Sequence, residues 1–182
     1  MVFTYGTQLA PHLGILEFAA AAQHALPWRA LERARDMSAA SLSPRGDWIA
    51  YQSQQSGEYQ VYVDRFPGLD DPKQVSGDGG GSHPVWSADG RELFFNRLDG
   101  AMMAVQVTIT PALEIVRPTM LFENKGYGRG ARAGGGGSRV WDLAPDGRFL
   151  LSKESAPSTA AEDSIVVVQN WSEELKRPAP DP

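Results

Sequence analysis

Three stretches of the chain repeat one pattern of apolar and polar positions. They read LSPRGDWIAYQS at 42–53, WSADGRELFFNR at 86–97 and LAPDGRFLLSKE at 143–154. Each begins with an apolar residue and continues through turn-forming residues and a glycine to a charged residue and an apolar run. Asp-Gly and related dipeptides adopt positive φ at low cost and reverse a strand tightly. Each stretch therefore predicts a β-hairpin, with Gly46, Gly90 or Gly147 in its turn.

Further apolar runs follow each hairpin at matched positions. A third strand is predicted at 58–66, 101–109 and 164–171, because Val, Ile, Tyr and Phe dominate these runs. A short fourth strand is predicted for KQVS after Pro72 and for TMLFE after Pro118. Proline is tolerated there because an edge strand need not donate to a ladder. The third repeat has no run that fits a fourth strand.

The spacing of the repeats indicates the fold class. Gly46 and Gly90 are 44 residues apart, and Gly90 and Gly147 are 57 apart. A period in the low forties is that of one four-stranded propeller blade. We expect an all-β partial β-propeller of about three four-stranded blades at 38–80, 81–124 and 138–171, the third incomplete. The alternative is an unrelated β-sandwich with three similar hairpins.

The ordered series of motifs resembles a known family. SPRGDWIAYQS, EYQVYVDRFPG, QVSGDGGGSHPVWSADGRELFF and MMAVQV look like TolB-type propeller repeats. More narrowly, they resemble the propeller at the C-terminus of bacterial receptor-like serine/threonine kinases. The closing SIVVVQNWSEELKR is similar to the end of those chains, where a strand leads into a short helix. The resemblance covers about 38–178 and implies a propeller with a binding role. It carries over no catalytic residue, and related propellers are often extracytoplasmic.

Residues 1–37 lie outside this resemblance. The stretch GILEFAAAAQHALPWRALERARD is rich in good helix formers, so a partly helical extension is predicted, broken or kinked at Pro27. It is either an appended helical arm or a sequence joined to the propeller from outside. The segment lacks a basic n-region and Glu17 interrupts its apolar run, so it is not a good secretory signal. The run is also too short to span a bilayer, and we expect a soluble chain without membrane insertion.

The predicted blades are too few to close a ring. Closed propellers usually have four to eight blades, and an open fan leaves exposed edges that favour association. We therefore expect a homodimer that completes a six-bladed ring, or a comparable edge-to-edge assembly. A truncated fragment that associates only in a crystal is the alternative. MVFTYGTQL at 1–9 is a candidate for the missing fourth strand of the third blade, from the same chain or from a partner chain.

Composition narrows the classes of partner. The 182 residues are 42% hydrophobic and 21% charged, which is typical of a globular chain. The net charge of −5 argues against general nucleic-acid binding, which needs a basic face. There is no cysteine, so disulfides, thiolate nucleophiles and cysteine-ligated zinc are excluded.

A glycine-rich stretch, GYGRGARAGGGGS at 126–138, satisfies the dinucleotide fingerprint through Gly128, Gly130 and Ala133. That fingerprint requires a helix immediately after it. Four glycines follow Ala133 instead, and such a run does not nucleate a helix. We interpret the stretch as a lengthened connection between two blades.

Hydrolytic chemistry has few candidate residues. No G-x-S-x-G motif is present, and Ser82 beside His83 is a poor nucleophile–base pair because neighbours in a strand point to opposite faces. Asp70, Asp71 and Asp78 are weak candidates for Ca²⁺ ligands, although loop aspartates are commonly turn formers. Some propeller lactonases and esterases hold a central Ca²⁺. A Ca²⁺-dependent ester or lactone hydrolase with its site at the channel mouth is therefore the alternative function, and no other cofactor is expected.

The connections at 77–83 and 124–139 are expected at one rim of the central channel, and function in such folds sits in loops. They carry basic and aromatic side chains that suit an anionic small molecule or an acidic peptide. The alternative is a solvated loop whose arginines aid solubility. The candidate ligand-binding residues are Ser82, His83, Tyr127, Arg129, Arg132 and Arg139. The predicted function is a non-catalytic binding or scaffold module that self-associates.

The apolar residue four positions before each turn glycine is expected to fill one inter-blade core slot. These residues are Leu42, Trp86 and Leu143. The aromatic residues after the turns are likewise expected to pack between blades.

Overall fold

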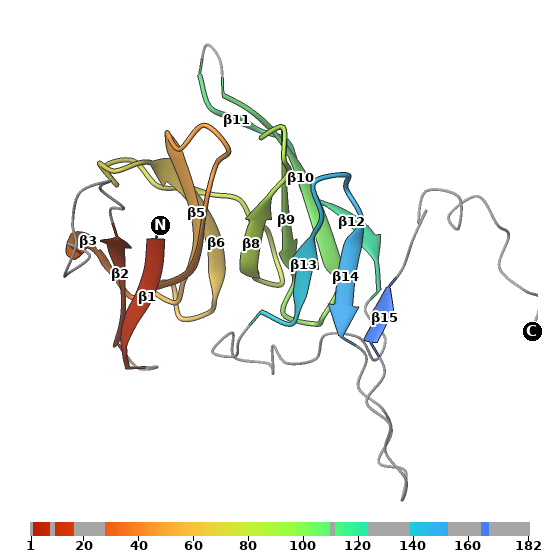
Figure 1. Ribbon diagram of the computed structural model, residues 1–182, viewed down its shortest axis with the longest axis horizontal. Helices are drawn as coiled ribbons and strands as arrows, with labels where there is room; N and C mark the ends of the chain where they lie inside the picture. The colour runs from red at the N-terminus through yellow and green to blue at the C-terminus, as the bar shows by residue number, and fades with distance from the viewer. Residues whose placement is uncertain are drawn as a thin grey trace, which may run out of the picture.

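The computed structural model describes residues 2–7, 10–16, 28–109, 112–123, 139–152 and 165–167, and these ranges contain strands and no helix (Figure 1). The strands form four antiparallel sheets, which we number I to IV in chain order. Sheet I comprises β1 (Val2–Thr7), β2 (Ala10–Leu16) and β3 (Trp28–Arg35), and sheet II comprises β4 (Met37–Leu42), β5 (Trp48–Ser53), β6 (Gln60–Arg65) and β7 (Lys73–Gln74). Sheet III comprises β8 (Ser82–Trp86), β9 (Glu92–Asn96), β10 (Met102–Thr108), β11 (Glu114–Ile115) and β12 (Thr119–Phe122). Sheet IV comprises β13 (Trp141–Leu143), β14 (Phe149–Ser152) and β15 (Ile165–Val167).

The three predicted hairpins are confirmed. Gly46, Gly90 and Gly147 have φ values of 72°, 71° and 85°. In each turn the glycine N–H donates to the carbonyl of the residue three positions earlier, at 2.8, 3.0 and 2.9 Å respectively. Positive φ is the conformation in which glycine has the least steric cost. One local geometry therefore starts sheets II, III and IV.

Three apolar cores hold the four sheets together face to face. Leu13 and Ile15 of sheet I pack with Ile49 and Tyr51 of sheet II. Between sheets II and III the core includes Trp48, Val61, Trp86, Leu93 and Phe95. Between sheets III and IV, the Phe94 and Phe149 rings meet edge to face with centroids 5.2 Å apart. Sheets II and III are thus packed on both faces.

The predicted core position of the apolar residue four places before each turn glycine is also confirmed. Trp86 is 6% exposed and belongs to the core between sheets II and III. Leu42 packs against the core between sheets I and II, and Leu143 against the core between sheets III and IV. Each residue therefore fills the space between its own sheet and the preceding one.

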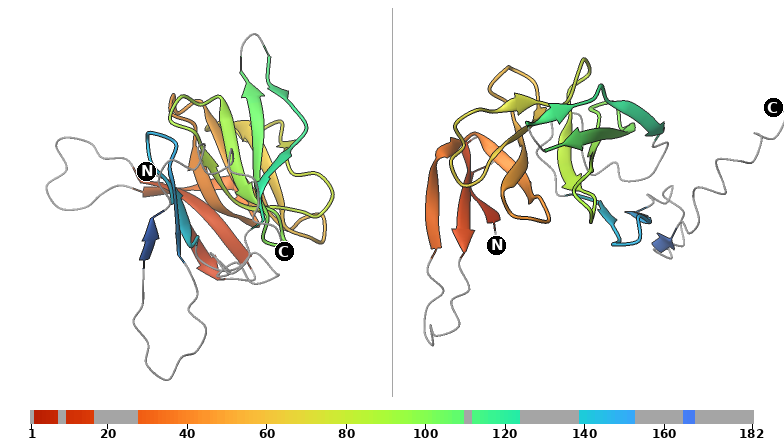
Figure 2. Two further views of the ribbon diagram at one scale, coloured as in Figure 1. Left: turned by 90° about the vertical axis from the view of Figure 1, so that its right-hand side faces the viewer. Right: turned by 90° about the horizontal axis from the view of Figure 1, so that it is seen from above.

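The sheets follow one another around an open arc. Viewed from above, sheets I and IV stand at the two ends and sheets II and III lie between them (Figure 2). The first strands of sheets I to III are neighbours, because β4 contacts both β1 and β8. Sheet IV continues the series, since Val85 of β8 and Trp141 of β13 share one core. The view of Figure 1 looks into the open side of the arc.

The N-terminal segment differs from its prediction. Where residues 1–37 are described, they form the three strands of sheet I and the start of β4, and no helix. Helix propensity is a weak preference that burial overrides, and here Leu13, Ile15 and Leu31 cover the face of sheet II. The described residues therefore form four sheets where about three blades were expected.

The first strand does not supply the missing strand of the third repeat within the chain. β1 pairs with β2, with Val2 opposite Ile15 and Thr7 opposite Ala10. Sheet IV has three strands among the described residues. The predicted C-terminal helix and the glycine-rich connection at 124–138 lie outside the described residues, as does the segment 17–27 with Pro27. No helix in the described ranges is long and apolar enough to cross a membrane.

Tyr51 provides a test of the core between sheets I and II. It is buried, its ring stacks on Tyr62 with centroids 5.8 Å apart, and burial, with the Asp64 carboxylate as a second cause, raises its pKa above the ordinary value of 10.0. A folded-state pKa above the unfolded value contributes stability below pH 10 that is lost as the pH rises beyond it. We expect alkaline unfolding, followed by circular dichroism, to begin near pH 10 and to shift to higher pH in Tyr51→Phe. An unchanged alkaline midpoint in that variant would contradict this assignment.

Candidate functional site

The starts of β4 and β8 share an irregularity. The pairing register shifts between Ser38 and Ser41 in β4 and between Ser82 and Val85 in β8. Ala39 and His83, one residue after Ser38 and Ser82, have positive φ values of 48° and 55°. Such values are uncommon outside glycine and persist only where the surroundings fix them. Ser38 and Ser82 are 44 residues apart, so these bulges are a repeated feature of the fold.

Gln52 joins the two bulges across the boundary between sheets II and III. Its Nε2 donates to the Ser38 hydroxyl at 3.0 Å, and its Oε1 accepts from the backbone N–H of His83 at 2.9 Å. Gln52 is 2% exposed. A second bond crosses the same boundary, since the Trp86 indole N–H donates to the Ser41 carbonyl at 3.2 Å. The Gln52 amide and the Trp86 indole therefore both have partners at this boundary, as buried polar groups require.

The boundary between sheets III and IV lacks these bonds. Ser82 pairs with Asn96 as Ser38 pairs with Gln52, so Asn96 is the repeat equivalent of Gln52. The side chain of asparagine is one methylene shorter than that of glutamine. Among the described residues the Ser82 hydroxyl, which is 1% exposed, has no hydrogen-bond partner. The buried indole N–H of Trp141 also has none. Two buried polar groups are thus unsatisfied at this boundary.

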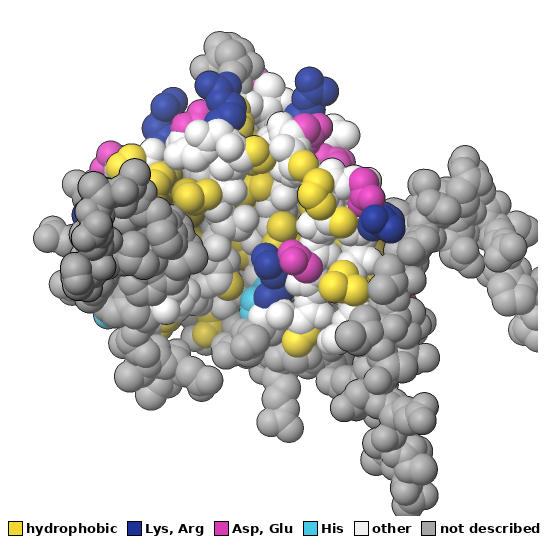
Figure 3. Space-filling model, viewed as in Figure 1, with side chains coloured by type: hydrophobic (Ala, Val, Ile, Leu, Met, Phe, Trp, Pro, Cys, Tyr) yellow, Lys and Arg dark blue, Asp and Glu magenta, His cyan; other side chains and the backbone are white. Residues whose placement is uncertain are grey.

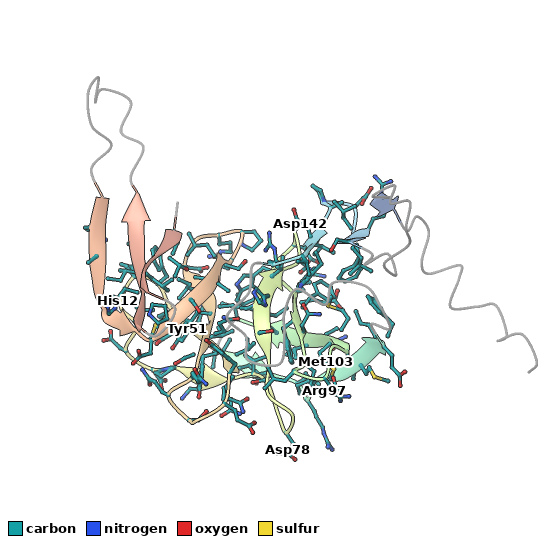
Figure 4. The ribbon with its side chains drawn as sticks, turned by 90° about the horizontal axis from the view of Figure 1, so that it is seen from below. His12, Tyr51, Asp78, Arg97, Met103 and Asp142 are labelled. Carbon is teal, nitrogen blue, oxygen red and sulfur yellow. The ribbon has the colours of Figure 1, made fainter. Side chains whose placement is uncertain are left out.

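A charged pair lies beside this boundary. The Arg139 guanidinium is 3.0 Å from the Asp142 carboxylate and stands over the Trp141 ring, 5.9 Å from its centroid. Both charged side chains are partly exposed. Figure 4 shows Asp142 on the open side of the arc, away from Asp78 and Arg97. Arg139 thus places a positive charge next to Trp141, whose indole N–H has no hydrogen-bond partner among the described residues.

The predicted site residues fall into three groups. Ser82 and His83 lie at the start of β8, and both are buried. Arg139 lies just before β13. Tyr127, Arg129 and Arg132 lie outside the described residues.

The candidate calcium ligands are exposed. Asp71 is paired with Lys73 at 2.8 Å, and its backbone N–H donates to Asp64 at 3.1 Å. Asp70 is its neighbour in the same connection, and Asp78 lies on the convex side of the arc (Figure 4). Within the described ranges no group of three or more His, Cys, Asp or Glu could hold a metal ion.

Surface charge is mixed where it can be seen. On the face in Figure 3, dark blue and magenta side chains lie mostly beside one another. Elsewhere in the described residues, charged side chains also pair over short sequence distances, as in Arg45–Asp47, Arg97–Asp99 and Arg148–Asp146. The described face in this view therefore carries no broad basic surface of the kind that nucleic acids need.

Sequence reasoning did not single out Ser38, Gln52, Asn96 or Trp141. The signal for the first three was present, because Ser38 and Gln52 recur 44 residues later as Ser82 and Asn96. Their roles depend on the bulges and the strand register, which the residue pattern does not reveal.

Comparisons with known proteins bear on the fold. No protein-family model matches the chain, and no curated protein matches it. Among solved structures, the chain is similar to TolB from Acinetobacter baumannii, with 18% identity, a TM-score of 0.49 and coverage of 83% of this chain and 36% of that one. It is also similar to the putative TolB from Agrobacterium tumefaciens, with 17% identity, a TM-score of 0.50 and coverage of 83% and 48%.

The chain spans between about a third and a half of the length of these TolB proteins. At this identity the likeness concerns the fold alone. It supports the TolB-like resemblance of the motifs, while the narrower link to the propellers of receptor-like kinases stays a prediction. In its fold, the chain is similar to part of a TolB-type β-propeller.

Proposed function

We propose that the chain is a non-catalytic binding and scaffold module that completes a propeller ring with a second copy of itself. The observation that carries the proposal is the open arc. Sheets II and III each contribute to two apolar cores, whereas sheets I and IV each contribute to one. Each end of the arc therefore has a sheet face without a neighbouring sheet among the described residues.

The outer face of sheet IV is suited to packing against another sheet. Phe149 and Leu151 point into the core with sheet III, so Leu150 between them points to the opposite face. Leu150 is 44% exposed and pairs in register with Asp142 on one side and Val167 on the other. An exposed leucine in the middle of a sheet face is suited to packing against another sheet.

The number of sheets sets the size of the ring. Three blades per chain would have given six in a dimer, but the chain has four sheets among its described residues. Two copies then contribute eight, which is still within the range of closed propellers. In such a dimer, sheet IV of each copy packs against sheet I of the other, and a twofold axis relates the two interfaces.

Leu150 is the residue that tests this interface. We expect Leu150→Lys to shift the dimer toward monomer, because the interface would have to bury the lysine ammonium group next to the Asp142 carboxylate, and the desolvation of both charges is costly. Sedimentation velocity of the wild type and the variant at equal concentration measures the effect. Val116→Lys is the matched control, because Val116 is 53% exposed and lies on sheet III next to β11. Equal sedimentation of all three proteins as monomers would contradict the proposal.

The binding role also includes a ligand at the concave side of the arc. An anionic small molecule or an acidic peptide is the class that the Arg139 region suits, although Asp142 already offsets part of its charge. The alternative is a Ca²⁺-dependent ester or lactone hydrolase with its site at the channel mouth. Ester and lactone turnover measured with and without a chelator distinguishes the two functions.

A further inference from the structure

We propose that the boundary between sheets III and IV binds a carboxylate through the Ser82 hydroxyl and the Trp141 indole N–H. The inference rests on the binding role proposed above and names the chemical class of its ligand. It does not depend on dimer formation, since both residues belong to one chain.

The two polar groups line the same boundary. Trp141 belongs to the core between sheets III and IV. Ser82 pairs with Asn96, which lies two residues beyond Phe94 on β9 and so shares its face. Phe94 packs in that same core, so the pairing places Ser82 on the side of sheet III that faces sheet IV. Both side chains are more than nine-tenths buried and have no hydrogen-bond partner among the described residues.

The boundary between sheets II and III shows that buried serine and indole groups in this fold can have hydrogen-bond partners. Between sheets II and III the equivalent serine, Ser38, is bonded to Gln52. The buried indole at that boundary, Trp86, is bonded to the Ser41 carbonyl, although the repeat equivalent of Trp86 in sheet IV is Leu143 and not Trp141. A buried polar group without a partner costs about 1–3 kcal/mol. Two such groups at one boundary are therefore a substantial cost that an external hydrogen-bonding group would remove.

The chemistry of the two groups specifies what the occupant offers. An indole N–H is a donor only, and a hydroxyl also donates. The occupant must therefore present acceptors, and a carboxylate presents two oxygens. Arg139 over the Trp141 ring adds a positive charge that favours an anion, while Asp142 offsets part of it. The remaining positive charge is small, which favours a singly charged carboxylate over a phosphate.

Titration of the Trp141 indole signal tests the proposal. In the amide and indole NMR spectrum, sodium acetate is expected to shift the Trp141 N–H signal saturably, while the Trp48 indole serves as an internal control. Sodium chloride and acetamide at equal concentration are expected to give no saturable shift. The same titration of Ser82→Ala is expected to weaken binding at least about fivefold, which is the loss of about 1 kcal/mol for one hydrogen bond.

Two peptides distinguish the sources of the carboxylate. A short glutamate-rich peptide that binds at least tenfold more tightly than acetate, and more tightly than its glutamine-substituted counterpart, would identify an acidic peptide. Equal affinity for acetate and the glutamate peptide would identify a free carboxylate. The absence of a saturable Trp141 shift with any carboxylate, or an unchanged affinity in Ser82→Ala, would overturn the site.

A stability measurement keeps the test independent of ligand choice. Ser82→Ala is expected to leave the melting temperature of the ligand-free protein unchanged or to raise it, because it removes a buried hydroxyl that has no partner. A clear decrease would mean that the hydroxyl is bonded within the chain. The solution mass of the same sample reports separately on ring completion, so failure of the dimer and failure of the carboxylate site are distinguishable.

Discussion

Replacement of Trp86 by alanine is expected to lower the free energy of unfolding by roughly 3–5 kcal/mol. The side chain is 6% exposed and fills the core between the two central sheets together with Trp48, Leu93 and Phe95. Truncation removes buried apolar area and leaves a cavity, and both effects destabilise. It also deprives the Ser41 carbonyl of the indole N–H that crosses the boundary.

Urea denaturation followed by far-ultraviolet circular dichroism measures the Trp86 effect. Met120→Ala is the control, since Met120 is 50% exposed and surface substitutions are usually within about 0.5 kcal/mol. Trp86→Phe keeps most of the ring and is expected to lose much less stability than Trp86→Ala. A loss of less than about 1 kcal/mol in Trp86→Ala would be incompatible with a core position.

The second large effect is expected for Gln52→Met. Methionine has nearly the volume of glutamine but forms neither the bond to Ser38 nor the bond to His83. The variant leaves the His83 N–H and the Ser38 hydroxyl without the partner that Gln52 provides. Each unsatisfied buried group costs about 1–3 kcal/mol, and Ser38 is only half-buried, so we expect a total loss of roughly 2–4 kcal/mol.

Gln106→Met is the matched control for Gln52→Met. Gln106 is an exposed strand residue in β10, so its substitution changes the chemistry without burying an unsatisfied group. Thermal unfolding of both variants is the measurement. Equal melting temperatures for the two variants would mean that the Gln52 bonds do not hold sheets II and III together.

The hairpins could be predicted because their determinants are local. Asp89-Gly90 and Asp146-Gly147 are adjacent in sequence, and each turn closes within a few residues. The repeat spacing of 44 residues then relates one sheet to the next without any knowledge of tertiary contacts. The all-β class followed from these two observations.

Sheet I could not be predicted in the same way. The segment around β3 contains Ala, Leu, Glu and Arg, which favour helix in isolation. Its actual state depends on the face of sheet II, where Ile49 and Tyr51 need a cover that Leu13 and Leu31 provide. A strand presents alternate residues to such a face, and this tertiary gain outweighs a propensity difference of less than about 1 kcal/mol per residue.

The candidate site was found in part. Ser82 and His83 were selected from their position before an inner strand, and Ser82 remains in the proposed carboxylate site. Trp141 was not selected, because its unsatisfied indole N–H becomes visible only when its core neighbours are known. The Gln52 bridge likewise depends on a pairing register that shifts at each bulge.

The solution mass of the purified chain tests the central claim most directly. Light scattering coupled to size-exclusion chromatography, over a range of protein concentrations, gives this mass without reference to shape. Ring completion by a second copy predicts a species of twice the chain mass of 19.8 kDa. A folded species of 19.8 kDa at every concentration would contradict ring completion by a second copy.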